Sequence, residues 1–223
     1  MCGLIYTKRV DGKNANEDIK RIYFSQKSRG KNGYGFVNIQ TGVYVRSKYE
    51  HEILGYLKRN PGSEILWHHR NPTSTMNTTD TAHPLCSGNN FKDHRYYLVH
   101  NGKIVNAQTL LIKHEKEKLV YSSILGKDKW NIPVFNDSES LLLELASVIE
   151  GVKEKKDFSA YGPIAFMMLQ TDNVVKPLYL YFGRNDGNPL KINATKERLI
   201  IASDIEGDDV IVDRLYKISY EDN

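Results

Sequence analysis

The chain has 223 residues and a mass of 25.6 kDa, which suits one compact domain or at most two small ones. Apolar residues make up 40% and charged residues 26% of the sequence, and this balance argues against wholesale disorder. The net charge of +4 is small and spread along the chain, so it indicates neither a nucleic-acid nor a membrane partner, and the two cysteines, Cys2 and Cys86, exclude a disulfide scaffold.

Targeting signals and membrane spans are not expected. No apolar run is long enough to cross a bilayer, and the first residues lack the charged leader and apolar core of a secretory signal. We therefore expect a cytoplasmic protein with reduced thiols.

The first part of the chain shows patterns of short strands and amphipathic helices. A helix is predicted over Asn16–Ser28, where apolar side chains share one face, and Arg29-Gly30 is expected to end it with a left-handed glycine. The other expected elements are strands over Leu4–Val10, Tyr34–Ile39, Val43–Ser47 and Glu64–His68, and a short helix over Tyr49–Lys58.

A long polar segment from Asn71 to His94 separates these elements from the rest, and loops of this length are often functional. Beyond it we expect a strand over Tyr96–His100, helices over Ala107–Leu119 and Ser138–Glu150, and strands over Ile164–Gln170, Leu178–Phe182, Leu199–Ala202, Val210–Val212 and Leu215–Tyr220. Strands at both ends with helices between them favour two packed sheets flanked by helices.

Cys2 is the first residue that suggests chemistry. Initiator methionine is usually removed before a small residue, which would leave a free α-amino group beside the Cys2 thiol. Because an α-amine titrates near pH 7.7–8.0, nucleophile and base would then lie in one residue. The plainer interpretation is a small residue that happens to follow Met1.

Two charged residues have both a functional and a structural interpretation. Arg70 follows a predicted strand and can hold a carboxylate with its bidentate guanidinium, or it can be an ordinary surface arginine. Asp137 opens a predicted helix, where it can be an N-cap or can meet a substrate ammonium group.

The segment Val99-His100-Asn101-Gly102 also has two interpretations. Asn-Gly between apolar residues is first of all the signature of a type I′ hairpin turn. The Asn101 side-chain amide and the Gly102 N–H can also converge on one oxyanion. No histidine or cysteine spacing matches a known metal motif, so we expect no metal and no cofactor.

Taken together, the motifs resemble the glutaminase domain of class II glutamine amidotransferases, which are N-terminal-nucleophile hydrolases. The resemblance covers nearly the whole chain and keeps the family's order of motifs. The matching segments are Met1-Cys2-Gly3, Arg29 to Gly35, His68 to Thr73, Asn77, His83-Pro84, Val99 to Gly102, Asn136 to Glu139, Gly183 to Leu190 and Ala202 to Asp204.

The resemblance implies an α+β fold, a four-layer αββα sandwich, in a single domain spanning residues 1–223. It also implies that Cys2 attacks the side-chain amide of L-glutamine while Asn101 and Gly102 stabilise the oxyanion. Arg70 would bind the substrate carboxylate, Asp137 its ammonium group, and Arg29 would support the pocket near Cys2. Thr73 and His100 are expected to complete the substrate-binding set.

The products implied are glutamate and ammonia, with ammonia passed to a separate synthase or other acceptor protein that docks over the loop from Asn71 to His94. Two alternatives stay open at this stage. One is another N-terminal-cysteine hydrolase acting on γ-glutamyl or N-acyl amides. The other is a non-catalytic binding domain of the same fold.

Overall fold

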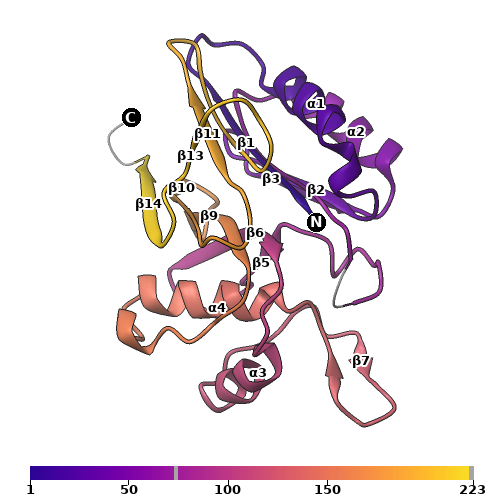
Figure 1. The fold of residues 1–223 in the computed structure, drawn as a ribbon, viewed down its shortest axis with the longest axis vertical. Coiled ribbons are helices and arrows are strands. Elements are labelled where there is room, and N and C mark those ends of the chain that lie inside the picture. The colour runs from indigo at the N-terminus through magenta and orange to yellow at the C-terminus, as the bar shows by residue number, and fades with distance from the viewer. Residues whose placement is uncertain (73–74, 221–223) are drawn as a thin grey trace.

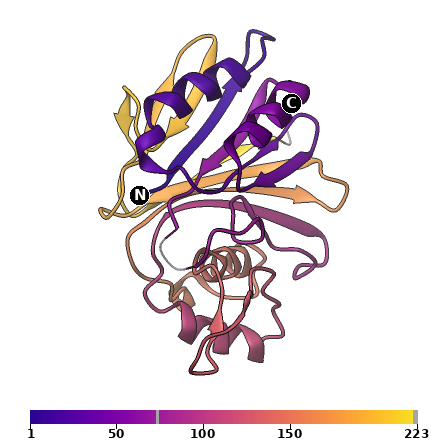
Figure 2. The same ribbon diagram turned by 90° about the vertical axis from the view of Figure 1, so that its right-hand side faces the viewer.

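The computed structural model describes residues 1–72 and 75–220, which form four stacked layers (Figures 1 and 2). Two large antiparallel sheets pack face to face, with helices α1 and α2 on one outer side and α3 and α4 on the other. The α+β, four-layer αββα prediction is therefore confirmed. In the part of the chain that the structure describes, no helix has the length and apolar character that crossing a membrane would need.

The first sheet has seven strands in the order β13-β11-β12-β1-β4-β2-β3. Its strands are β1 (Gly3–Arg9), β2 (Tyr34–Asn38), β3 (Val43–Ser47), β4 (Glu64–His69), β11 (Lys191–Ala194), β12 (Arg198–Ala202) and β13 (Asp208–Asp209). Helices α1 (Asn16–Ser25) and α2 (Glu50–Arg59) cover its outer face, and a 3₁₀ turn, η1 (Lys27–Arg29), follows α1.

The second sheet has five strands in the order β14-β10-β9-β6-β5. Its strands are β5 (Leu85–Cys86), β6 (His94–Gly102), β9 (Ile164–Asp172), β10 (Pro177–Arg184) and β14 (Arg214–Ser219). Helices α3 (Ala107–Lys116) and α4 (Ser138–Ile149) lie on its outer side, followed by the 3₁₀ turn η2 (Lys155–Asp157). A small hairpin of β7 (Gly126–Lys127) and β8 (Pro133–Val134) projects from the body beside α3 (Figure 1).

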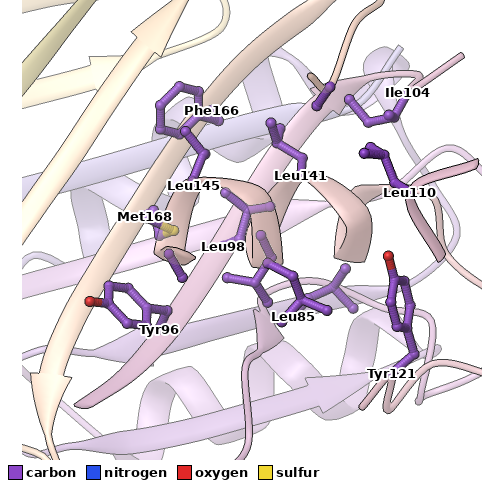
Figure 3. Close-up of a cluster of buried hydrophobic side chains, with 14 of the residues drawn as sticks. Leu85, Tyr96, Leu98, Ile104, Leu110, Tyr121, Leu141, Leu145, Phe166 and Met168 are labelled. Atoms are coloured by element: carbon purple, nitrogen blue, oxygen red, sulfur yellow. The ribbon is translucent and has the colours of Figure 1, made fainter. Parts of the chain in front are cut away.

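Side chains that point alternately to the two faces of the central strands fill three separate hydrophobic cores. In β1, Leu4 and Tyr6 lie in the core between the sheets, whereas Ile5 lies in the core under α1 and α2. In β6, Leu98 packs beneath α4 together with Leu141 and its neighbours (Figure 3). Each helix pair thus needs only one apolar face, and the central strands of both sheets are buried on both sides.

Three local expectations are wrong. Gly30 does not adopt the left-handed conformation but is extended, with φ −169°, and glycine is needed there because a Cβ would lie 2.7 Å from the backbone of Arg70. Asn101-Gly102 is not a hairpin turn, since β6 stays paired with β9 as far as Gly102 opposite Ile164. No strand forms over Val210–Val212, since the short β13 lies just before it at Asp208–Asp209.

Candidate active site

Cys2 lies directly before the central strand of the first sheet, and its position is set by backbone pairing. Gly3 pairs with His69 of β4, so the N-terminus is held in the middle of the sheet. Cys2 is buried, and its backbone N–H donates to Oδ1 of Asn101 at 3.0 Å. Because Asn101 belongs to β6, this hydrogen bond joins the two sheets at the N-terminus.

The Cys2 thiol faces the start of the long polar loop. The Asn71 N–H donates to Cys2 Sγ at 3.4 Å, and the Asn71 carbonyl lies 3.7 Å from the same sulfur. Burial raises the pKa of the Cys2 thiol, while the Asn71 N–H, the chain's N-terminal charge and Arg70 act in the opposite direction. Burial is the largest influence and Asp137 adds to it, so the pKa of the thiol stays above its usual value, and the Asn71 N–H and the positive charges offset this only in part.

Asn101 and Gly102 end β6 beside Cys2. With Oδ1 of Asn101 on the Cys2 N–H, its buried Nδ2 has no hydrogen-bond partner among the described residues. Gly102 has φ +151°, and a Cβ there would lie 1.8 Å from the Pro163 carbonyl oxygen, so only glycine fits. The residue that contacts the Cys2 backbone thus also carries a buried amide donor, the kind of group that can stabilise an oxyanion.

Arg29 contacts the backbone of Cys2 rather than its side chain. Its Nε donates to the Cys2 carbonyl at 3.1 Å. On the other side, a Cβ at Gly3 would overlap the His69 ring, whose Nε2 is 3.1 Å from the Gln26 carbonyl. Arg29 and the packing at Gly3 therefore fix the N-terminal strand close to where the resemblance places a pocket wall.

Arg70 is buried and binds the polar loop. Its Nη1 donates to Thr81 Oγ1 at 3.0 Å and to the Met76 carbonyl at 3.3 Å, and its Nη2 donates to Thr75 Oγ1 at 2.6 Å. Burial lowers the pKa of Arg70, whereas Cys2 and Asp137 raise it. The guanidinium therefore senses both residues electrostatically.

Asp137 occupies the N-cap position of α4 without capping it. Its Oδ2 accepts the backbone N–H of Ile104 at 2.6 Å, and its side chain makes no cap hydrogen bond. Asn136 serves the helix start instead, since its Oδ1 accepts the Ser138 N–H at 3.0 Å. The Asp137 carboxylate thus lies between the end of β6 and the start of α4 and is still close enough to influence Arg70.

His100 points to the opposite side of β6 from Asn101. Its Nδ1 lies 2.8 Å from Ser138 Oγ, and its carbonyl oxygen lies 3.2 Å from His68 Nε2. The structure therefore places His100 behind Asn101 and against α4. Thr73 lies outside the described residues. Among the described residues, no group of three or more His, Cys, Asp or Glu side chains is arranged to hold a metal ion.

Three further polar residues belong to this region and were given no role in the sequence analysis. Asn71 contacts the thiol, and Asn188 Nδ2 donates to the Asn101 carbonyl at 3.1 Å. Asn136 Nδ2 donates to the Thr81 carbonyl at 2.8 Å and so links α4 to the loop that Arg70 holds. All three lie within segments that carry the family resemblance, and Asn71 directly follows Arg70. Their place in these segments is the sequence signal that could identify them.

Comparisons with solved structures give the fold a class. Over 99% of its length the chain resembles "the allosteric regulatory enzyme of purine biosynthesis", with a TM-score of 0.72 and 17% identity. Over its whole length it resembles the glutamine phosphoribosylpyrophosphate amidotransferase of B. subtilis, with a TM-score of 0.61 and 18% identity. It spans 47% and 50% of those two chains.

A third structure is similar in size to this chain. The class-II glutamine aminotransferase domain protein of Silicibacter pomeroyi matches 99% of this chain and 96% of its own, with a TM-score of 0.54 and 12% identity. No protein-family model matches the sequence, and the search of curated proteins gives no match. The chain thus has the class II glutamine amidotransferase fold.

Proposed function

We propose that this chain is a glutaminase domain of the class II amidotransferase type, which hydrolyses the side-chain amide of L-glutamine. The observation that carries the proposal is the contact between Cys2 and Asn101. The Cys2 nitrogen lies 3.0 Å from Asn101 Oδ1, and the Asn101 Nδ2 donor is buried without a partner among the described residues. A nucleophile, its prospective amine and an oxyanion donor are thereby gathered from the two sheets.

In the proposed reaction, Met1 is removed and the α-amine of Cys2 accepts the thiol proton. The sulfur attacks the amide carbon of glutamine, and Asn101 Nδ2 and the Gly102 N–H stabilise the resulting oxyanion. The proton is passed to the leaving nitrogen and ammonia departs. Water then hydrolyses the γ-glutamyl thioester to glutamate and restores the thiol.

Substrate recognition is proposed for the charged groups around the thiol. Arg70 would bind the α-carboxylate and Asp137 the α-ammonium group, since opposite charges on the two ends of the amino acid require opposite partners. Arg29 would act only by holding the Cys2 carbonyl. A hydrolase of γ-glutamyl or N-acyl amides needs the same Cys2 chemistry but not both charged partners.

The experiment that tests the function combines intact mass with turnover. Purified protein is weighed before and after treatment with a glutamine-analogue electrophile, and glutamate release is then measured with glutamine and with glutaramide. We expect a mass that starts at Cys2, a single label that glutamine protects against, and turnover of glutamine only. Equal turnover of glutaramide would contradict recognition by Arg70 and Asp137.

Asn101→Asp is expected to reduce kcat by about 10²–10³-fold, because it keeps the side-chain shape and an oxygen for the Cys2 nitrogen but replaces the oxyanion donor by an acceptor. Steady-state glutamate release measures the change. The melting temperature of the variant serves as the control for folding. A kcat within about threefold of the unchanged protein would exclude Asn101 from the proposed role.

Arg70→Lys is expected to raise KM about tenfold or more. The planar guanidinium donates to Thr75 and Thr81 and, in the proposal, also binds the substrate carboxylate. A single ammonium group cannot make all of these contacts. Arg46→Lys is the matched control. Arg46 is also an arginine that binds this loop, since its Nη1 donates to the Asp80 and Ala82 carbonyls. Within the described part of the chain, no hydrogen bond joins Arg46 to Cys2. Equal changes in KM for the two variants would assign Arg70 a purely structural role.

A separate synthase or other acceptor protein stays a prediction of the same proposal. Free ammonia is lost to water, so the proposed domain should release glutamate slowly until an acceptor binds near the loop that Arg70 holds. Pull-down from the native extract, with glutamate release measured beside it, tests this. Fast turnover by the isolated chain with no protein recovered would instead indicate a stand-alone glutaminase.

A further inference from the structure

A cavity of about 580 Å³ lies on the outer side of the second sheet, away from Cys2. One wall is helix α4, which packs against β5 and β6. The opposite wall is the start of β14, and the segment between η2 and β9 closes one end. None of the residues proposed for the glutaminase reaction lines this cavity.

The floor of the cavity is apolar. Leu141 and Leu145 of α4 and Phe166 of β9 lie side by side there, and all three belong to the core beneath α4 (Figure 3). Leu215, which lines the β14 side, is 52% exposed. An exposed leucine beside a buried apolar floor leaves a surface that an apolar molecule can cover.

The rim of the cavity is mainly cationic. Lys155, Arg184 and Arg214 line it, with Asp213 as the carboxylate on the same rim. The Arg184 side chain is only 15% exposed, yet its ion-pair partner Asp209 lies 4.0 Å away and is itself 65% exposed. The guanidinium also donates its Nε–H to the Val210 carbonyl at 2.6 Å.

A largely buried guanidinium with one distant, solvated carboxylate is under-compensated in charge, and an anion placed in the cavity would remedy this. We propose that the cavity binds a small amphipathic anion, with its apolar body against Leu145, Phe166 and Leu215 and its carboxylate at Arg184. Arg184 itself has no role in the proposed glutaminase reaction. The inference stands independently of the proposed glutaminase activity.

The cavity wall is also bonded to the end of β6. Asn185, which lines the cavity, accepts the Ile164 N–H at 2.9 Å and donates to the Gly162 carbonyl at 2.7 Å. Pro163, held between those two residues, accepts the Lys103 N–H directly after Gly102. A ligand in the cavity would therefore lie against a segment that touches the proposed oxyanion residues.

Calorimetric titration with three ten-carbon probes tests the proposal on the full chain: decanoate, decanol and decylammonium, each below its micelle-forming concentration. We expect decanoate to bind with one site per chain, decanol to bind more weakly and decylammonium not to bind. Arg184→Gln should weaken decanoate binding about tenfold or more without changing decanol binding. Equal binding of decanoate and decylammonium, or no binding of decanoate, would overturn the proposal.

A pair of surface variants distinguishes decanoate binding in the cavity from a general effect of the protein's net charge. Leu215→Glu places a carboxylate at the cavity and should weaken decanoate binding, whereas Ile211→Glu makes the same change at a 51% exposed position that does not line the cavity. Both sites are exposed, so both variants should fold, and melting temperatures check this. An equal loss in the two variants would show that decanoate senses only the net charge.

Discussion

Cys2→Ala is expected to abolish glutamate release from glutamine, with a loss of at least about 10³-fold in kcat, because the thiol is the proposed nucleophile and no other group near Asn101 can replace it. Cys2→Ser should retain little activity, since a hydroxyl is a much poorer nucleophile near neutral pH. Both variants keep the backbone N–H that Asn101 accepts, so the fold should be unchanged.

The control for this prediction is Cys86→Ala. Cys86 is the only other cysteine of the sequence and lies in β5, where its sulfur accepts the Gly88 N–H. Its loss should leave glutamate release and labelling by the glutamine analogue unchanged. Full activity in Cys2→Ala, or loss of labelling in Cys86→Ala, would refute the proposed mechanism.

Mild acid is expected to destabilise this protein strongly between about pH 6.5 and pH 5. Burial lowers the pKa of His69 and of His100 to about 4, and it also lowers the pKa of His68 and His83 well below the usual value. In the unfolded chain each histidine titrates near 6.5, so the unfolded state binds more protons in this range. Stability is therefore full above pH 6.5 and falls as the pH falls.

The size of the effect follows from these values. At pH 5, a histidine with a folded pKa near 4 and an unfolded pKa near 6.5 removes about 2 kcal/mol from the free energy of unfolding. His69 and His100 together account for about 4 kcal/mol, and His68 and His83 change it in the same direction. This is a large share of the roughly 5–15 kcal/mol that stabilises a typical domain.

Urea unfolding at a series of pH values measures how the free energy of unfolding changes with pH. A His69→Gln variant tests whether His69 causes part of this change. Glutamine can still donate toward the Gln26 carbonyl that His69 Nε2 contacts, so the variant should fold and should lose stability less steeply with acid. Aspartate and glutamate titrate near pH 4, below this window. A free energy of unfolding that stays constant from pH 7 to pH 5 would contradict the prediction.

Much of the fold follows from local patterns. The strand over Val43–Ser47 has the predicted bounds, and the other main strands and helices differ from prediction by a few residues at their ends. The strand β11 and the hairpin of β7 and β8 were missed, because their short, polar or half-exposed segments carry no periodic apolar signal.

Two of the three wrong expectations share one physical cause. Local propensity favoured a turn at Asn101-Gly102, but pairing with the distant strand β9 keeps both residues in an extended ladder. Gly30 was expected to supply a left-handed helix end, yet its lack of a Cβ is used for close approach to Arg70. Contacts between segments far apart in the chain decided both cases, and a single sequence does not display them.

The candidate site was foreseen as a set of residues but not as a geometry. Cys2, Asn101, Arg70 and Asp137 were named from motifs, and the structure brings them to one end of the two sheets. That Arg70 also holds Thr75, Met76 and Thr81, or that Asn71 contacts the thiol, depends on how the loop folds back. Those contacts have no signature in residue spacing.

The burial of Cys2 has a consequence for the order of events during biosynthesis. Met1 is 64% exposed, but the next residue is 8% exposed, with its nitrogen on Asn101 and its carbonyl on Arg29. A peptidase must draw the first residues into its own cleft, and in the finished fold β1 cannot leave the centre of its sheet to allow this. If the working chain begins at Cys2, trimming has to take place on the ribosome or soon after, before β12 and β4 enclose the first strand.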